Sequence, residues 1–331
     1  MQIIDIETYF PKNETNNDDL EKMFPDWDQN SFVSKIGITN RYVASENETA
    51  VDMACEAAEE LLNSNERKEI DFLLFCTQSP DHFLPTSACI LQDRLGLNTN
   101  CGALDYNLGC SGYIYGLALA KGLFSCGIAK KILLITSETY SKHIYNKDIG
   151  NLSMFGDAAA ATLLENCDSN NSFGKFVLGT DGSGASNLIV NNGGFRAPLS
   201  KNTVERSCGS NSYYTDNHLF MNGPEIFNFT LERIPQLVDD VLLKNRLSIE
   251  EIDYFIFHQA NKFMLKHLMM KINIPAHKFY NNMEYCGNTV SSTIPIALNN
   301  CISEKKIKKG DKVMLVGFGV GYSWGATIIT L

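Results

Sequence analysis

Three side chains of this 331-residue chain are of types that together could transfer an acyl group: Cys110, His258 and Asn288. Cys110 follows an apolar run, Cys101–Leu104, that predicts a buried strand, and it opens an apolar helix rich in small residues. Unpaired N–H groups and the dipole at a helix N-terminus lower the pKa of a cysteine there and favour the thiolate. The simpler interpretation is a buried small residue, which describes most free cysteines. Position alone therefore makes Cys110 only a candidate nucleophile.

His258 and Asn288 could act on a substrate that this cysteine holds. His258 ends the apolar run IDYFIFH, and Asn288 lies in the turn sequence GNT. A thiolate exchanges with a thioester at nearly neutral energy, so the exchange needs positioning and a place for the oxyanion. A histidine and an asparagine nearby could donate hydrogen bonds to an incoming thioester as it becomes an enolate. Taken singly, His258 is more often a structural strand-end histidine and Asn288 a turn former.

The elements that must position these residues occur twice in the chain. The strand IDFLLFC (70–76) recurs as IDYFIFH (252–258), and KKILLI (130–135) recurs as DKVMLV (311–316). An apolar helix lies at the matching place in each copy, GYIYGLALAKG in the first and SSTIPIALNNC in the second. Apolar strands resemble one another, but two pairs in register with a helix between them are hard to obtain by chance. The sequence therefore predicts one fold unit used twice.

Alternating strands and helices in each half predict an α/β protein with mainly parallel sheets and right-handed crossovers. We place the halves at residues 1–168 and 169–331, with the boundary in the polar segment CDSNNSFG. Ligands of α/β units gather outside the carboxyl ends of parallel strands. The Asn288 turn corresponds to the Cys110 turn, and His258 ends a repeated strand. A pseudo-two-fold axis would therefore bring all three side chains toward one point.

The remaining segments predict further elements around this core. We expect a strand at residues 2–6, a helix at 46–64, a helix starting at Pro85–Thr86 and a long loop at 193–217. The glycine-rich GFGVGYSWG (317–325) follows a strand and could bring backbone N–H groups close to Cys110. It does not match a dinucleotide fingerprint, because a strand and not a helix follows it.

Composition excludes several classes of protein. The 38 acidic and 28 basic residues give a net charge of −10, which argues against a general nucleic-acid binder. Lys121 interrupts the most apolar helix, so we expect no membrane span, and the N-terminus carries no basic leader. The ten cysteines include no CxxC pair and no zinc spacing, which predicts reduced thiols in the cytoplasm and no metal site.

Several motifs resemble those of one known family over nearly the whole chain. They are NLGCSGYIYGL around Cys110, FHQANK at His258, CGNTVSSTIP at Asn288, FGDAAAATLL at 155–164, FMNGPEIFNF at 220–229 and FGVGYSWGA near the C-terminus. Together they resemble the β-ketoacyl-acyl carrier protein synthase III group of the thiolase superfamily. The resemblance implies a thiolase-like duplicated fold in layers, α-β-α-β-α, with halves related by a pseudo-two-fold axis, and a homodimer.

The resemblance also implies roles for individual residues. Cys110 would accept the acyl group, and His258 and Asn288 would assist decarboxylation of malonyl-acyl carrier protein and steady the enolate. The backbone N–H groups of Cys110 and Val320 would form the oxyanion hole. The implied substrate pocket consists of Leu84, Gly150, Phe155, Asn261 and Gly319, with Leu84 placed where a partner residue closes the acyl pocket. The product would be a 3-oxoacyl thioester, and no metal or redox cofactor is needed because loss of carbon dioxide drives the reaction.

Three positions depart from the family pattern. Members commonly carry a tryptophan and an arginine that sandwich the adenine of a coenzyme A starter, and this chain has Ser31 and Ile149 there. Losing both should weaken adenine binding, so the starter would arrive on an acyl carrier protein or coenzyme A would be held differently. Val320 replaces a glycine of the family, and valine disfavours a positive φ.

An acidic carrier protein would need basic residues at the tunnel mouth. Lys262, Lys266 and Lys271 follow His258 on one predicted helix, although lysines on a helix are usually just its solvated side. Other functions also remain open at this point. They are acyl transfer from the cysteine to an alcohol or amine, hydrolysis by a Cys-His-Asn arrangement, and a non-catalytic scaffold that binds a carrier protein.

Overall fold

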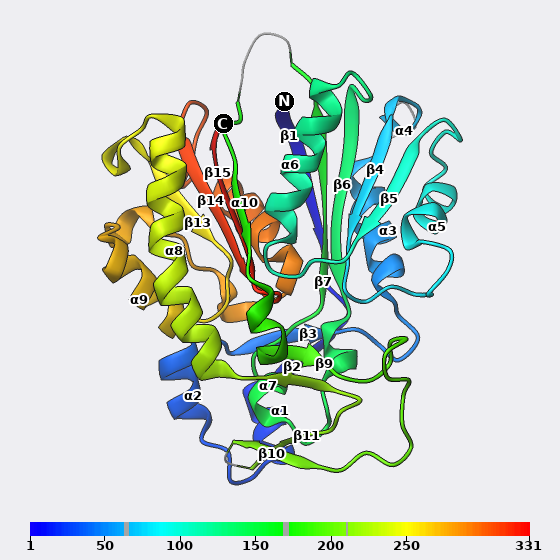
Figure 1. Ribbon diagram of the computed structural model, residues 1–331, viewed down its shortest axis with the longest axis vertical. Helices are drawn as coiled ribbons and strands as arrows, with labels where there is room; N and C mark the ends of the chain where they lie inside the picture. Colours follow the sequence, from blue (N-terminus) through cyan, green and yellow to red (C-terminus); the bar gives the residue numbers. More distant parts are fainter. Residues whose placement is uncertain (63–65, 168–171, 210) are drawn as a thin grey trace.

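Two β-sheets stand side by side in the computed structural model, which describes residues 1–62, 66–167, 172–209 and 211–331 (Figure 1). The first sheet has the order β1 (Gln2–Tyr9), β7 (Ala158–Glu165), β6 (Lys131–Glu138), β4 (Phe72–Cys76), β5 (Gly102–Tyr106). The second has the order β8 (Val177–Thr180), β15 (Ser323–Thr330), β14 (Lys312–Gly319), β13 (Tyr254–Phe257). In both sheets the repeated strands pair in parallel and the strands beyond them are antiparallel.

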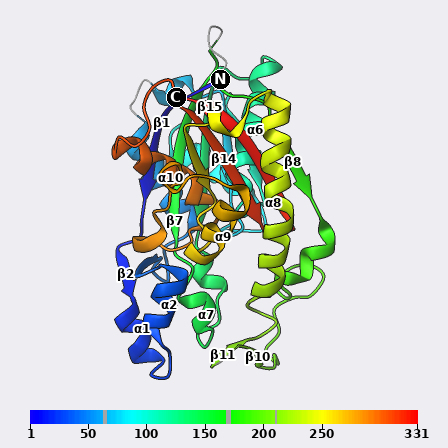
Figure 2. The same ribbon diagram turned by 90° about the vertical axis from the view of Figure 1, so that its left-hand side faces the viewer.

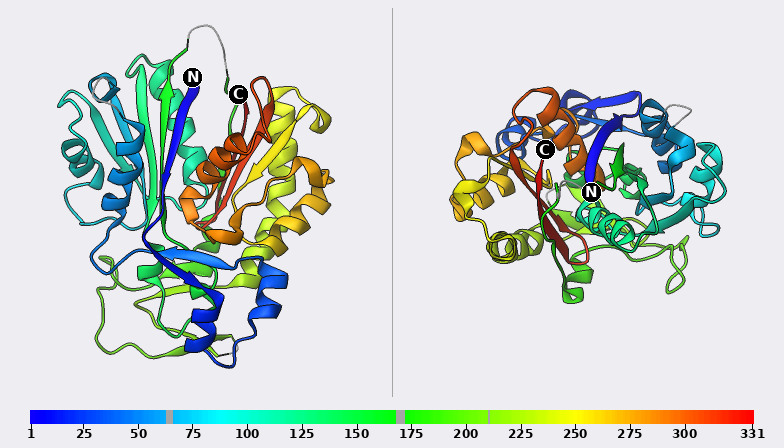
Figure 3. Two further views of the ribbon diagram at one scale, coloured as in Figure 1. Left: turned by 180° about the vertical axis from the view of Figure 1, so that it is seen from behind. Right: turned by 90° about the horizontal axis from the view of Figure 1, so that it is seen from above.

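Helices cover both outer faces and fill the space between the sheets (Figures 1 and 3). The outer face of the first sheet packs on α3 (Ala50–Leu61) and α5 (Ser87–Arg94), and that of the second packs on α8 (Gly223–Asn245), which in turn packs on α9 (Lys262–Ile272) (Figure 2). Between them, α6 (Gly112–Ser125) and α10 (Thr293–Ser303) each contact strands of both sheets. The five layers α-β-α-β-α confirm the predicted fold class.

Equivalent hydrogen bonds in the two sheets support the predicted duplication. The Asp71 carboxylate accepts from the backbone N–H of Lys131 at 3.0 Å, and the Asp253 carboxylate accepts from that of Lys312 at 2.8 Å. The strands are continuously apolar because helices cover both of their faces. Where the first sheet has β5, the second has, among the residues that the structure describes, an isolated parallel bridge between Phe255 and Phe279.

A smaller layer closes one end of the sheets, at the bottom of Figure 1. Its elements are β2 (Asn13–Asn16), α1 (Asn17–Met23), α2 (Gln29–Ile36), β3 (Asn40–Val43), α7 (Ile149–Leu152), β9 (Leu188–Val190), β10 (Arg206–Gly209), β11 (Ser212–Tyr214) and β12 (Leu219–Met221). The prediction of a long loop at 193–217 is therefore wrong in part, because β10 and β11 pair as antiparallel strands within it. The short helices α4 (Glu66–Glu69), η1 (Tyr140–His143), η2 (Gly182–Asn187), η3 (Ile249–Glu251), η4 (Ala276–Lys278), η5 (Met283–Tyr285) and η6 (Val290–Ser292) complete the chain.

Element bounds differ from the predictions by a few residues. The first strand extends to Tyr9, and α3 starts only at Ala50, where a capping box of Thr49 and Asp52 satisfies its first N–H groups. The division at 168/169 falls outside the described residues, so the two halves stay a prediction. No helix among the described residues is long and apolar enough to cross a membrane.

Candidate active site

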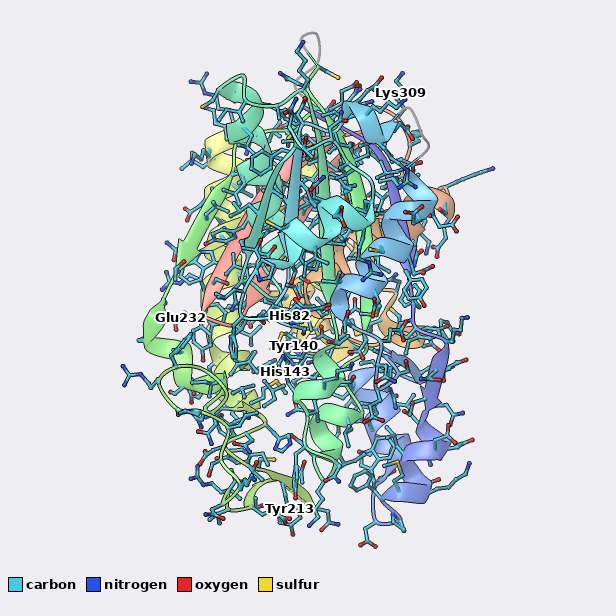
Figure 4. The ribbon with its side chains drawn as sticks, turned by 90° about the vertical axis from the view of Figure 1, so that its right-hand side faces the viewer. His82, Tyr140, His143, Tyr213, Glu232 and Lys309 are labelled. Carbon is cyan, nitrogen blue, oxygen red and sulfur yellow. The ribbon has the colours of Figure 1, made fainter. Side chains whose placement is uncertain are left out.

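All three candidate catalytic residues line one cavity of about 90 Å³. It lies where the repeated strands end, between the two sheets and the closing layer. Its walls are Cys110, Tyr140, Met154, Phe155, Leu188, Met221, Gly223, Ile226, His258, Ala260, Asn261, Met264, Asn288, Phe318 and Gly319. Figure 4 shows Tyr140 at this junction, close to His143. The convergence that the duplication predicts is thus present in the fold.

Cys110 lies in a tight turn two residues before α6, held against the end of β14. A Cβ atom at Gly317 would lie 2.9 Å from the Cα of Ser111, and one at Gly319 would lie 2.9 Å from the Cys110 sulfur. Only glycine therefore allows β14 to approach the turn this closely. The backbone N–H groups of Cys110 and Val320 both lower the pKa of the Cys110 thiol, because they favour negative charge on the sulfur. This is the pair expected to form the oxyanion hole.

The expectation of a low pKa for Cys110 is wrong. The side chain is almost fully buried, and burial raises the pKa of its thiol to about 12. The charge of the buried Glu138 acts in the same direction, while the two backbone N–H groups lower the pKa without overcoming burial. At neutral pH Cys110 is therefore a thiol, and an acceptor for its proton is needed when it attacks.

His258 follows β13 and is buried beside the ring edge of Phe318. Burial lowers the pKa of its imidazole to about 3, so the ring is neutral at pH 7. Its Nδ1 lies 2.7 Å from the hydroxyl of Thr293, which itself donates to the carbonyl of Val290 at 3.1 Å. In that arrangement Nδ1 carries the hydrogen and donates to Thr293, which leaves the lone pair of Nε2 free.

Asn288 is oriented by its own turn. Its Oδ1 accepts from the backbone N–H of Val290 at 2.9 Å, which leaves the amide N–H groups for a substrate oxygen. Val290 has a φ of 55°, a left-handed conformation that costs a β-branched residue about 1–3 kcal/mol. Val320 replaces a glycine of the family, but its backbone has no positive φ and is therefore not strained in that way.

The five residues predicted to line the substrate pocket do not all line one cavity. Phe155, Asn261 and Gly319 line the cavity of Cys110. Gly150 lines a neighbouring cavity instead. Leu84 is 84% exposed and does not line the Cys110 cavity of its own chain, so a role there requires a second copy.

Two further cavities share wall residues in succession with the catalytic cavity. Met154, Met221 and Gly223 are shared between the catalytic cavity and the next one, which shares Trp27, Phe32 and Ile149 with an outer cavity of about 610 Å³. Ser31 also lines the outer cavity. Trp27 was not identified from the sequence as a cavity residue. Its position, four residues before Ser31, could have suggested an aromatic side chain near the place where the family has its tryptophan.

The three predicted docking lysines, Lys262, Lys266 and Lys271, are all exposed on α9. This helix begins at the cavity, since Asn261 both lines the cavity and caps the helix by accepting from the Met264 N–H at 2.8 Å. Lys35 on α2 lines the outer cavity beside it. The same cavity is also lined by Asp26 and Asp28, so the α9 lysines remain a predicted docking surface.

A buried cysteine, histidine and asparagine at the junction of two duplicated sheets define the class of thiolase-fold acyltransferases. Family models described as 3-oxoacyl-[acyl-carrier-protein] synthase III match residues 104–182 and, for the C-terminal part, 242–331. A Clostridium perfringens protein named beta-ketoacyl-[acyl-carrier-protein] synthase III is 36% identical over 98% of this chain and 97% of its own.

Solved structures agree with these matches. One described as a 3-oxoacyl-(acyl-carrier-protein) synthase III has a TM-score of 0.96 at 46% identity over 99% of both chains. A 3-oxoacyl-(acyl-carrier protein) synthase from Burkholderia xenovorans LB400 has a TM-score of 0.89 at 34% identity, over 100% of this chain and 93% of its own. The chain belongs to the 3-oxoacyl-acyl carrier protein synthase III family.

Proposed function

We propose that this protein condenses a starter acyl thioester with malonyl-acyl carrier protein, releasing carbon dioxide and giving a 3-oxoacyl thioester. The observation that carries the proposal is the shared cavity of Cys110, His258 and Asn288, together with two backbone N–H groups that favour negative charge on the sulfur. Family membership makes this chemistry the expected one. Neither a metal nor a redox cofactor is needed, because decarboxylation supplies the driving force.

In the first step the Cys110 sulfur attacks the starter carbonyl. The thiol proton passes to the free Nε2 of His258, and the N–H groups of Cys110 and Val320 stabilise the oxyanion. The carbon–sulfur bond to the starter's carrier then breaks, and the leaving thiolate takes the proton from His258. The acyl group is now a thioester of Cys110, and the imidazole is neutral again.

In the second step malonyl-acyl carrier protein loses carbon dioxide. The electron pair of the broken bond forms an enolate, whose oxygen accepts from the Asn288 amide and from His258. Donation by Nε2 requires the other neutral tautomer. It forms when Nδ1 gives its proton to water, Nε2 takes one from water, and the Thr293 hydroxyl turns to donate to Nδ1. The enolate carbon then attacks the acyl carbonyl, and the bond to the Cys110 sulfur breaks. The released thiolate takes a proton from water, which restores the thiol.

Incubation with malonyl-acyl carrier protein and acyl donors tests this reaction. Carbon dioxide release with a 3-oxo product supports condensation. Free acid alone indicates hydrolysis, transfer to an added alcohol or amine indicates a different acyltransferase, and absence of an acyl-enzyme in the intact mass indicates a scaffold. The C110A variant controls for carbon dioxide lost without acylation.

We propose that the starter arrives on an acyl carrier protein rather than on coenzyme A. Ser31 and Ile149 give the outer cavity neither the aromatic face nor the cation expected at those positions for adenine. The test compares kcat/KM for the same acyl group on both carriers. A preference for coenzyme A that the W27A variant abolishes would mean that Trp27 holds the adenine instead.

The exposed lysines of α9 are proposed to dock the acidic carrier protein. The K262E/K266E variant should raise KM for malonyl-acyl carrier protein at least tenfold, since charge reversal replaces attraction by repulsion. The K308E/K309E variant is the matched control, because Lys309 lies near the end of the molecule opposite Tyr213 of the closing layer, and Lys308 and Lys309 follow α10 and not α9 (Figure 4). An equal rise in KM for the two variants would contradict docking of the carrier protein on α9.

We further propose a homodimer in the cytoplasm. Phe83, Leu84, Phe195 and Leu199 are 70–96% exposed, and β5 is an unpaired edge of its sheet. A second copy would cover this surface and bring its Leu84 toward the acyl pocket. All ten cysteines are unpaired, which suits a reducing compartment. Sedimentation of wild type and of F83D/F195D tests the interface, and a monomeric wild type would refute it.

A further inference from the structure

Glu138 is a buried acid that none of the steps above uses. It ends β6 and is 0% exposed. Its Oε2 accepts from the backbone N–H of Gln78 at 3.0 Å and from the Ser79 hydroxyl at 3.1 Å, while its Oε1 accepts from the Ser291 hydroxyl at 2.9 Å. No salt bridge reaches it within the described part of the chain.

One side of this carboxyl group supports the Cys110 turn. The Gln78 side chain donates to Oδ1 of Asn107 at 3.1 Å, and its Oε1 fills the space in which a Cβ of Gly109 would stand, 2.6 Å away. Tyr140, which lines the catalytic cavity, donates to the same Oε1 at 3.4 Å. Gln78 therefore connects Glu138 to the residues immediately before the nucleophile.

The other side supports the Asn288 turn. Ser291 directly follows Val290, whose N–H holds the Asn288 side chain and whose carbonyl accepts from Thr293. The hydrogen bond from Ser291 to Glu138 joins residues 153 positions apart in the sequence. The two segments come from opposite halves of the chain, and they meet at one carboxyl group.

We propose that Glu138 is a positioning residue that fixes the Cys110 turn and the Asn288 turn relative to each other, and that its carboxyl group, which Gln78 links to the residues just before Cys110, also influences the reactivity of that thiol. The consequence for condensation rests on the proposed function. The consequence for the thiol does not, because alkylation of Cys110 requires no condensation.

The charge of Glu138 gives this role a measurable signature. Burial raises the pKa of its carboxyl to about 8, and the nearby Asp157 acts in the same direction. The other titratable groups that its charge affects are Cys76, Tyr106, Cys110 and Tyr140, all of which it makes harder to ionise. Ionisation of Glu138 above pH 8 therefore opposes formation of the Cys110 thiolate.

The first experiment measures alkylation of Cys110 by iodoacetamide between pH 6 and 10, read from the mass of its peptide. The E138Q variant keeps the shape and can still bond Gln78 and Ser291, since a serine hydroxyl also accepts. Without the charge, its profile should shift to lower pH by about one unit, equivalent to about tenfold faster alkylation at pH 9. Superimposable profiles of wild type and E138Q would overturn the influence on the thiol.

The second experiment tests the link to the Asn288 turn. The S291A variant removes the hydroxyl that reaches Glu138, and S292A is its matched control because Ser292 is an adjacent buried serine that bonds Thr136 instead. S291A should lower kcat for condensation about tenfold relative to S292A, with KM and the alkylation of Cys110 at pH 7 unchanged. Equal kcat values for the two variants would overturn the positioning role.

These outcomes separate the inference from the proposed function. If wild type shows no condensation, the proposed function fails, and the alkylation profiles still decide whether Glu138 controls the thiol. If E138Q does not fold, by circular dichroism, the comparison of S291A with S292A still decides the positioning role.

Discussion

The contact between Gly319 and Cys110 gives a sharp test of the site geometry. An alanine at 319 would place its Cβ 2.8 Å from the Cys110 Cβ and 2.9 Å from its sulfur. Ordinary contact begins at 3.4 Å, so the turn or the strand must move by at least about 0.5 Å. The backbone of Gly319 has no positive φ, so this crowding is the main effect of the substitution.

This displacement moves the Cys110 sulfur, which is the atom that attacks the starter carbonyl. A shift of this size reaches the tolerance of a catalytic arrangement, and a misplacement of about 1 Å costs about 100-fold. We expect G319A to form acyl-enzyme about 10- to 100-fold more slowly, measured by intact mass in single-turnover experiments. Overpacking of the core should also lower the free energy of unfolding by about 1–3 kcal/mol.

G122A is the matched control. Gly122 lies within α6, and a Cβ atom there meets nothing within 4 Å. The substitution should stabilise the protein by about 0.5–1 kcal/mol and leave acylation unchanged. Wild-type acylation in G319A would refute the close approach of β14 to the nucleophile, and equal slowing in both variants would mean that the effect is not local.

Three further variants test the remaining site. N288D replaces the amide donor by a carboxylate, so malonyl decarboxylation should fall about 100- to 1000-fold while Cys110 is still acylated; loss of acylation as well would contradict the assigned step. T293V removes the hydroxyl that holds Nδ1 of His258 and should lower kcat about tenfold or more in the same decarboxylation assay, with T293S close to wild type. E138Q should gain stability relative to wild type as the pH rises from 4.5 to about 8, because the unfolded chain releases the Glu138 proton near 4.5 and the folded protein keeps it to about 8. Urea unfolding at pH 5 and pH 8 measures this difference, and a pH-independent difference would contradict it.

The sequence determined the duplicated architecture and the convergence of three residues. Repeated apolar strands at matching intervals specify which strands pair, and the carboxyl ends of parallel strands meet at one edge, so Cys110, His258 and Asn288 had to approach one another. Both follow from the spacing of apolar residues along the chain and from the right-handed crossovers between parallel strands, and both can be read from a single sequence.

Other properties depended on the packing of segments distant in sequence. The helix position of Cys110 predicted a lowered pKa, whereas the second sheet buries the sulfur and raises it. Trp27 and Gly150 contribute to cavities that no linear spacing defines, and Glu138 connects the two halves through Ser291. A sequence pattern predicts only which neighbours a residue has within its own helix or strand. Desolvation and long-range hydrogen bonds depend on what the rest of the chain places against it, and that is decided only when the sheets come together.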